Sequence, residues 1–412
     1  MLKNKKTVIL IIYIFVNAML LCSCTGGKEI KDLALVTAIG LDVEDDNVVL
    51  TCEISNPLFN LNTDASSSAS VSVMFVQGKG KTLFEAITNT SLNFERRLFF
   101  SHAELLIIGE EFAKKGITQN LDYLLRAQEP RENIKMVVAK GTKAYEVMGI
   151  SGELSASGGQ YINEVLEKFV YNGKTININL AQYFRYYYSI SNEPVIGVVQ
   201  KEIKERIDKE KKKFEPTETI LNVGGGAVTK RDYLIGYFTP EEMLGFNFIV
   251  DDIKSGIIVI NTPDKLNKNI SVIGDSGKFT SIEILKSRTK KDIKIKDGKI
   301  HLDLNVKLRG SLIEENKAID MDDEEIIKLI GDACSKEIKK VISNTLNKGQ
   351  KEFKQDNFSI GETLHHQHPK VWKEIAEEWE DIFTDITYSI NVESEIVKIG
   401  MINVPSNLRK RR

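Results

Sequence analysis

The chain has 412 residues, a formal net charge of −2, 42% hydrophobic residues and 28% charged residues. This composition is typical of a soluble globular protein that is long enough for two or three domains. It argues against a nucleic-acid-binding protein, which would carry a marked excess of basic residues.

The N-terminus resembles a bacterial lipoprotein signal. Three lysines among the first six residues precede an apolar run from Val8 to Leu21, which is short for a membrane span. A basic start followed by a short apolar run predicts a signal peptide over residues 1–23. Leu21-Cys22-Ser23-Cys24 resembles a lipobox, in which the cysteine thiolate takes up a diacylglycerol group. We therefore predict lipidation of Cys24 and anchoring to the outer face of a membrane. The alternative is that Cys24 is only a small residue behind an uncleaved segment.

The next part of the chain is predicted to be an N-terminal α/β domain over residues 24–200. Hydrophobic patterning predicts a hairpin, three further strands and two helices. The predicted strands are Leu33–Leu41, Val48–Ile54, Val71–Val76, Ala103–Ile108 and Ile134–Ala139. The predicted helices are Lys81–Leu92, with Leu83, Phe84, Ile87 and Leu92 at helical spacing, and Glu110–Gln128. Asn60–Ser70 is rich in small polar residues and is predicted to be a surface loop.

Aromatic residues are concentrated between Val165 and Tyr188. The densest group comprises Tyr183, Phe184, Tyr186, Tyr187 and Tyr188. A stacking platform for sugars or single-stranded nucleic acid is one interpretation, but no basic run accompanies these rings. The pattern therefore favours packing within a helix or across a domain face.

A highly charged segment from Lys201 to Lys213 divides the chain. Its mixture of lysines and acids predicts a solvated linker over 201–216 or an exposed helix. A C-terminal α/β region is expected over 217–405, either undivided or broken into two subdomains near 290–300. The basic tail, 406–412, either contacts anionic headgroups or is a solvated terminus.

The second half is predicted to be strand-rich with one long helix. Thr239, Pro240 and Glu242 predict a capped short helix, and the long helix is expected from about Asp322 to Phe353. The predicted strands are Ile220–Val223, Gly226–Thr229, Tyr233–Phe238, Gly256–Asn261, Ser281–Lys286, Ile300–Arg309 and Thr387–Ile402. The fold class is therefore α+β or mixed α/β in three domains, with mixed sheets flanked by helices.

Two cysteines remain besides Cys22 and Cys24. Cys52 falls on the inward face of a predicted strand, and Cys334 falls in the apolar stripe of the long helix. We interpret both as small core residues rather than as a disulfide or a reactive pair.

No catalytic constellation emerges from the sequence. Gly224-Gly225-Gly226 lacks the later Gly-Lys-Ser/Thr of a phosphate loop and is interpreted as a turn or bulge. His365, His366 and His368 could ligate zinc, with Glu362 as the one further donor nearby. However, adjacent histidines on a helix point apart, and Pro369 disfavours helical geometry at His368. Surface imidazoles in a helix–turn–helix are the preferred interpretation, so no metal, cofactor or catalytic residue is assigned.

Several stretches together resemble the Ger(x)C family of spore germination lipoproteins. They follow the order expected for the family and span most of the chain. The matching stretches are Lys28–Asp42, Ser101–Gly116, Arg126–Arg131, Val137–Gly141, Gly361–His365, His368–Trp372 and Trp379–Phe383.

This resemblance implies a mixed α/β fold in three domains and a non-enzymatic role. It implies the C subunit of a spore nutrient germinant receptor, on the outer surface of the spore inner membrane. The implied partners are two polytopic proteins, an A subunit and a transporter-like B subunit that receives the germinant. The C subunit would be required for receptor assembly or signalling.

Two rival functions follow from the sequence. A solute-binding lipoprotein that feeds a membrane transporter would need a cleft between the two halves, lined by residues of Tyr183–Tyr188. An envelope hydrolase would need a nucleophile or metal site, and the sequence offers neither.

Overall fold

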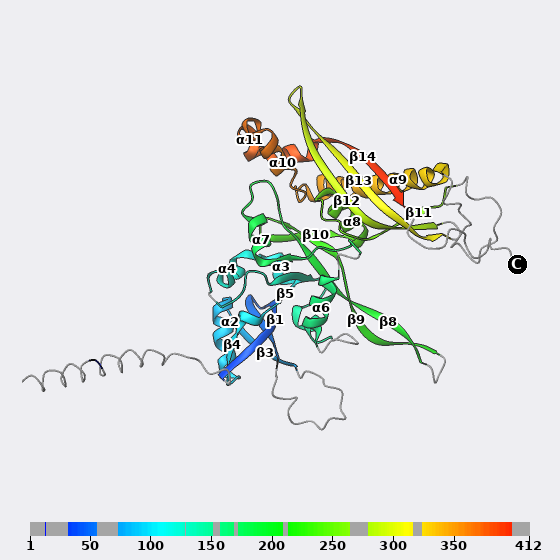
Figure 1. Cartoon of the computed structure of the whole chain (residues 1–412). Coiled ribbons are helices and arrows are strands. Elements are labelled where there is room, and N and C mark those ends of the chain that lie inside the picture. The colour runs from blue at the N-terminus through cyan, green and yellow to red at the C-terminus, as the bar shows by residue number, and fades with distance from the viewer. Residues whose placement is uncertain are drawn as a thin grey trace, which may run out of the picture.

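The structure is a computed structural model that describes Tyr13 and residues 32–55, 73–127, 129–150, 157–168, 172–208, 213–263, 279–315 and 324–397. Cys24, the predicted loop at 60–70 and the basic tail lie outside these residues. The described chain forms two mixed β-sheets, each flanked by helices (Figure 1). The predicted mixed α+β class is confirmed.

The larger sheet contains ten strands of the described chain. Its main path runs β10 (Tyr233–Phe238), β9 (Lys213–Lys230), β8 (Val195–Asp208), β6 (Lys135–Ala139), β5 (Leu105–Gly109), β1 (Leu33–Glu44), β2 (Asn47–Ser55) and β3 (Val73–Gly80). Two short strands lie off this path: β4 (Arg97–Phe99) pairs with β1, and β7 (Ile178–Asn179) pairs with β6. The central strands β1, β5, β6 and β8 are parallel. Every residue of β5 is buried, as expected for a parallel strand covered on both faces.

Short helices connect and cover these strands. They are α2 (Leu83–Asn89), α3 (Glu110–Lys115), α4 (Thr118–Arg126), α5 (Ala144–Met148), α6 (Gly158–Glu167) and α7 (Leu180–Tyr187). The single helix predicted over Glu110–Gln128 is wrong, because Gly116 adopts a φ of +116° and ends α3. Helix α4 begins at Thr118, whose backbone N–H donates a hydrogen bond to Oδ1 of Asp232.

The charged segment after Lys201 is a β-hairpin, so its interpretation as a linker or exposed helix is wrong. Strands β8 and β9 pair from Lys201 opposite Leu221 to Asp208 opposite Lys213, with one register shift between Lys204 and Glu205. Figure 1 shows this hairpin projecting beyond the rest of the sheet. In such a hairpin the backbone N–H and C=O groups find hydrogen-bond partners on the paired strand, and no apolar face is needed. Hydrophobic periodicity in the sequence therefore gave no sign of the hairpin. Gly225, with a φ of +90°, occupies a bulge in β9, as predicted.

The smaller sheet has the order β11 (Ile257–Asn261), β12 (Phe279–Lys296), β13 (Lys299–Glu315) and β14 (Thr387–Val397). It is flanked by α8 (Pro240–Ile249) and the long helix α9 (Glu324–Lys348), which ends in a π-helical turn, Gly349–Phe353. Thr239 and Glu242 form the predicted capping box of α8.

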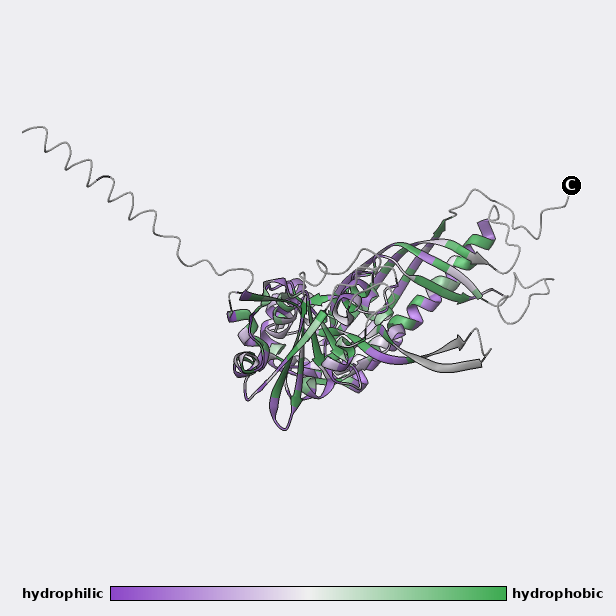
Figure 2. Cartoon of the chain, turned by 90° about the horizontal axis from the view of Figure 1, so that it is seen from below, coloured by the Kyte–Doolittle hydropathy of each residue, from purple (hydrophilic) through white to green (hydrophobic). Residues whose placement is uncertain are grey.

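Helix α9 presents one apolar face, on which Ile330, Cys334, Ile338 and Ile342 are buried, and it packs against β14 and β11. Figure 2 shows this amphipathic pattern as alternating green and purple bands along the long helix. At Gly331 an added Cβ would lie 2.7 Å from the carbonyl oxygen of Ser394, so the helix approaches β14 closely there. Three short helices complete this half: α10 (Ile360–Gln367), α11 (Pro369–Ile375) and α12 (Trp379–Asp385).

A buried carboxylate organises the contact between the two halves. Asp356 is 1% exposed and accepts four hydrogen bonds. The donors are the backbone N–H groups of Phe358 (2.9 Å), Ile360 (3.3 Å) and Gly361 (2.7 Å) and Nε1 of Trp379 (3.1 Å). Burial raises the pKa of Asp356, and the three backbone N–H groups and the Lys291 ammonium oppose that rise.

The same loop bonds the first half of the chain. The backbone N–H of Glu193 donates to the Asp356 carbonyl oxygen at 3.1 Å, and Nδ2 of Asn357 donates to the Glu193 carbonyl oxygen at 3.1 Å. Nδ2 of Asn192 donates to Oγ of Ser359 at 2.7 Å. We call these contacts, between Asn192–Glu193 and Asp356–Ser359, the seam.

The core continues across the seam. One cluster of buried side chains extends from Ala34 in β1 to Ile396 in β14. The region 290–300, suggested as a subdomain break, lies within the β12–β13 hairpin. The division of the chain into domains stays a prediction.

Replacing Asp356 should destabilise the whole protein. In Asp356→Ala, four donors lose their acceptor in the interior, and we expect the free energy of unfolding to fall by about 3 kcal/mol or more. Urea denaturation followed by tryptophan fluorescence measures this, since Trp379 is one of the donors. Asp385→Ala, at an exposed aspartate at the end of α12, is the control and should change the free energy by less than about 0.5 kcal/mol. Equal losses in the two variants would contradict the role of the buried carboxylate.

Candidate interaction site

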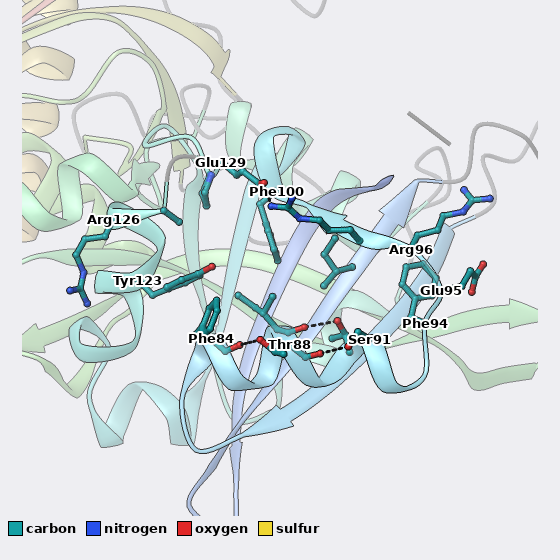
Figure 3. A pocket seen from close by; sticks show the side chains of 16 residues that line it. Phe84, Thr88, Ser91, Phe94, Glu95, Arg96, Phe100, Tyr123, Arg126 and Glu129 are labelled. Carbon is teal, nitrogen blue, oxygen red and sulfur yellow. Dashed lines mark hydrogen bonds and ion pairs between the residues drawn. The ribbon is translucent and has the colours of Figure 1, made fainter. Parts of the chain in front are cut away.

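A cavity of about 1030 Å³ lies between α2, β4 and the end of α4 (Figure 3). We call it the tether cavity, because β4 pairs with the first residues of β1 and places Arg97 opposite Leu33. The chain therefore enters the fold beside this cavity, from the segment that carries Cys24. Cys24 itself lies outside the described residues.

Aromatic and apolar side chains line much of the tether cavity. The ring of Phe84 from α2 contacts the ring of Tyr123 from α4 in a tilted arrangement, with 5.4 Å between the ring centroids (Figure 3). Phe84 is 59% exposed, although it is a large hydrophobic residue, whereas Leu98 and Phe100 are buried beneath the cavity. Burial and the nearby Glu129 carboxylate raise the pKa of Tyr123, so its hydroxyl stays neutral.

Three arginines surround the aromatic residues. Arg97 forms an ion pair with Glu129, and Arg126 pairs with Asp122 at 2.5 Å. Arg96 lines the cavity at the end opposite Arg126 (Figure 3). Ser101 Oγ donates to the Glu129 carbonyl oxygen at 2.9 Å and holds the segment that carries this acid.

This combination of side chains is that of a binding surface. Exposed aromatic residues and arginines are enriched at the energetic centres of protein–protein interfaces. The cavity contains no cysteine or histidine that could act as nucleophile or base. Across the described residues, no group of three potential metal ligands is assembled.

Sequence patterning gave only part of this site. Phe84 and Leu92 were expected on one helical face with Leu83, yet Phe84 is 59% and Leu92 77% exposed. Helix α2 ends at Asn89, and only Leu83 and Ala86 are buried in it. A helix of two turns has a narrow buried face. The polar run Thr88–Ser91 was a sign in the sequence that this helix ends before Leu92.

The aromatic group near Tyr183 is largely packed, as expected. Tyr183 and Phe184 are buried, their rings are 5.5 Å apart, and the Tyr183 hydroxyl lies 3.1 Å from Oγ1 of Thr118. Tyr188 is 69% exposed. Tyr186 lines a second, smaller cavity, which lies at the seam.

The three histidines considered as zinc ligands make other contacts. His365 and His366 are exposed on α10 and stack at 6.0 Å, and His365 also lies 5.8 Å from the Trp372 ring. His368 has Nε2 3.0 Å from the Ile293 carbonyl oxygen. These contacts match the interpretation as side chains of a helix–turn–helix.

Both cysteines of the described chain are free and buried, which confirms them as core residues. Burial raises the pKa of the Cys52 thiol, and raises that of Cys334 to about 11. Neither thiol is therefore a ready nucleophile at neutral pH.

Two family models match consecutive parts of the chain. The model described as spore germination protein N-terminal domain matches residues 26–201, and the model described as spore germination B3/GerAC like, C-terminal, matches residues 224–400. The first match ends and the second begins within the β8–β9 hairpin.

Relatives of known name match over nearly their full length. Spore germination protein KC of Bacillus subtilis (strain 168) is 26% identical and aligns over 96% of this chain and 97% of that protein. Spore germination protein B3 of the same organism is 23% identical and aligns over 94% of this chain and 97% of that protein.

A solved structure shares the fold. The crystal structure of the GerBC protein superposes with a TM-score of 0.55 at 18% identity, covering 87% of this chain and 96% of that one. Among the described residues, no helix has both the length and the apolar composition needed to cross a membrane.

The exposure of Phe84 predicts that it is dispensable for folding. Phe84→Ala should change the free energy of unfolding by less than about 1 kcal/mol, because the ring is already largely hydrated. Phe100→Ala, at a ring that is 5% exposed, should cost about 3–5 kcal/mol through the cavity that it leaves. Urea denaturation of both variants checks this, and a large loss in Phe84→Ala would show that this ring has a structural role.

Proposed function

Because the chain belongs to the Ger(x)C family of spore germination proteins, we propose that it is the lipid-anchored C subunit of a nutrient germinant receptor. In this proposal the mature protein is held by Cys24 on the extracytoplasmic face of the spore inner membrane. It acts without catalysis, in assembly or signalling of a complex with membrane-embedded A and B subunits.

The position of the tether cavity carries this proposal. Cys24 precedes Leu33, the first residue of β1, by nine residues. An extended chain spans at most about 3.3–3.6 Å per residue, so the tether reaches roughly 30 Å. Acyl chains on Cys24 would contribute about 0.8 kcal/mol for each methylene buried in the bilayer. Lipidation would therefore keep the cavity close to the membrane surface.

The character of the cavity supports docking of a membrane protein there. Phe84 offers an exposed ring, and Arg96 and Arg126 offer charge at either end. Extracytoplasmic loops of the A and B subunits would be confined to the same thin layer, so that even a modest affinity gives stable association.

A second candidate function is the capture of a small solute for a membrane transporter. A cavity of about 470 Å³ at the seam, lined by Gln182 and Tyr186 of α7, favours it. A thermal-shift screen with amino acids and sugars tests this second candidate, because a bound solute stabilises the folded protein by mass action.

Removing the lipid-accepting cysteine should release the protein. We expect Cys24→Ala to move from the membrane to the soluble fraction, because the acyl chains that would anchor it are then missing, and to reduce the germination response to nutrients. Fractionation of spore membranes and loss of optical density after germinant addition measure the two effects. Unchanged fractionation and germination would count strongly against the proposal.

The tether cavity should be needed for association with the membrane subunits. We expect Phe84→Ala to reduce the recovery of A and B subunits in co-purification at least about fivefold, because interface rings of this kind contribute strongly to affinity. Ile313→Ala is the matched control, since Ile313 has the same 59% exposure but lies in β13. Equal recovery from both variants would exclude the cavity as the docking site.

A further inference from the structure

We propose that the cavity at the seam is a binding site for a small organic ammonium cation. This inference goes beyond the proposed receptor role and does not depend on the lipid anchor.

The seam cavity is shaped by both halves of the protein. Its volume of about 470 Å³ is within the range of small-molecule sites. The first half contributes Tyr186 from α7 and Asn192–Glu193 before β8. The second half contributes Lys291 from β12 and Asn357 from the loop before α10. A ligand here would contact segments separated by more than 160 residues, as the Asn357–Glu193 hydrogen bond already does.

Three acceptor atoms of residues that line this cavity lack hydrogen-bond partners. They are Oδ1 of Asn192, Oδ1 of Asn357 and Oε2 of Glu193. Asn192 is 5% and Asn357 2% exposed, and both use their amide nitrogens as donors within the seam. Buried acceptors without donors are costly, and a donor bound in the cavity would reduce that cost. All three are acceptors, and an ammonium group offers three donors and no acceptor.

Charge favours a cation over a neutral or acidic ligand. Four lining residues are acidic and one is a lysine, with His366 in addition. The acidic residues are Glu193, Asp251, Asp252 and Glu362. Lys291 is committed to the Phe358 carbonyl oxygen at 2.7 Å and lies near the Asp356 charge.

Glu193 is the acid best placed to bind the cation. Asp251 already accepts the backbone N–H of Thr289 at 2.8 Å, and Asp252 lies 3.6 Å from Lys254. Glu193 has one oxygen without a partner, and its carboxyl accepts the backbone N–H of Arg231. The nearby Lys230 charge is paired with Glu380 at 2.8 Å. Burial raises the pKa of Glu193 to about 7, and a bound cation would offset this cost by stabilising the carboxylate.

A metal ion is a poorer occupant than an organic cation. No group of three histidine, cysteine, aspartate or glutamate side chains in the described chain is close enough to hold a metal. Amide side chains, the hydroxyl residues Tyr186, Ser359 and Thr363, and apolar side chains such as Val195 and Phe246 supply the rest of the lining. These suit an ammonium group attached to a short carbon chain.

Isothermal titration calorimetry of the full-length lipoprotein in nonionic detergent tests whether the seam cavity binds an ammonium cation. The probes are putrescine, its neutral analogue 1,4-butanediol and the anion succinate, at equal concentration and ionic strength. We expect putrescine to bind with a dissociation constant below about 1 mM, and the other two to give no saturable heat. In Glu193→Gln the constant should rise at least about tenfold, since a charge-assisted hydrogen bond is lost.

The control variant is Glu377→Gln, which removes the same charge from an exposed position outside the cavity. It should bind putrescine as the unmodified protein does. Saturable binding of butanediol or succinate as tight as that of putrescine would overturn the proposal, as would equal affinities in the two variants. Calcium binding that Glu193→Gln abolishes, with no response to putrescine, would also overturn it and assign a metal site instead.

Discussion

The interior charge of Asp356 is the constraint on which the arrangement of the second half depends. A carboxylate that is almost fully buried must be surrounded by donors, and here three backbone N–H groups and one indole supply them. Those donors fix the loop before α10, the first turn of that helix and the position of Trp379. The same loop uses its remaining groups to bond Glu193 and Asn192, so one buried charge sets both the local fold and the contact between halves.

This constraint explains why particular residue types occur in the C-terminal motif. At Gly361 an added Cβ would lie 2.6 Å from Nε1 of Trp379 and 2.7 Å from the Ser191 side chain, so no side chain fits there. Trp379 is 3% exposed and packs at 5.5 Å from Trp372 and 6.2 Å from Phe383. The stretches Gly361–His365 and Trp379–Phe383, noted first as a family resemblance, thus supply two of the donors to the buried carboxylate. This packing accounts for Gly361 and Trp379 within them.

Sequence patterning predicted elements whose signal is local. Alternation through Leu302, Leu304 and Val306 marked β13, and the cap at Thr239 marked α8, because each depends on neighbours a few residues away. The charged hairpin was mispredicted, since its strands are defined by backbone pairing with each other. The tether cavity could not be predicted, because it depends on Leu33 lying opposite Arg97. A cleft between the halves, lined by residues of Tyr183–Tyr188, was expected only for the solute-binding alternative, and nothing in the sequence showed that Glu193 meets Asn357 there. Such contacts leave no trace in residue spacing.

The large sheet is the physical connection between the two cavities. Its β10 end contacts the second half through Tyr237, whose carbonyl oxygen accepts a hydrogen bond from Lys348 at 2.9 Å. Toward its other end, β1 and β4 lie beside the tether cavity, and β5, between the two regions, is buried along its whole length. A close-packed core has low compressibility, so a shift of the backbone at one place displaces the side chains packed against it. If a cation at the seam changes the affinity of the tether cavity for its partner by a given factor, partner binding at the tether cavity must change the affinity for that cation by the same factor, because coupling between two binding sites is reciprocal.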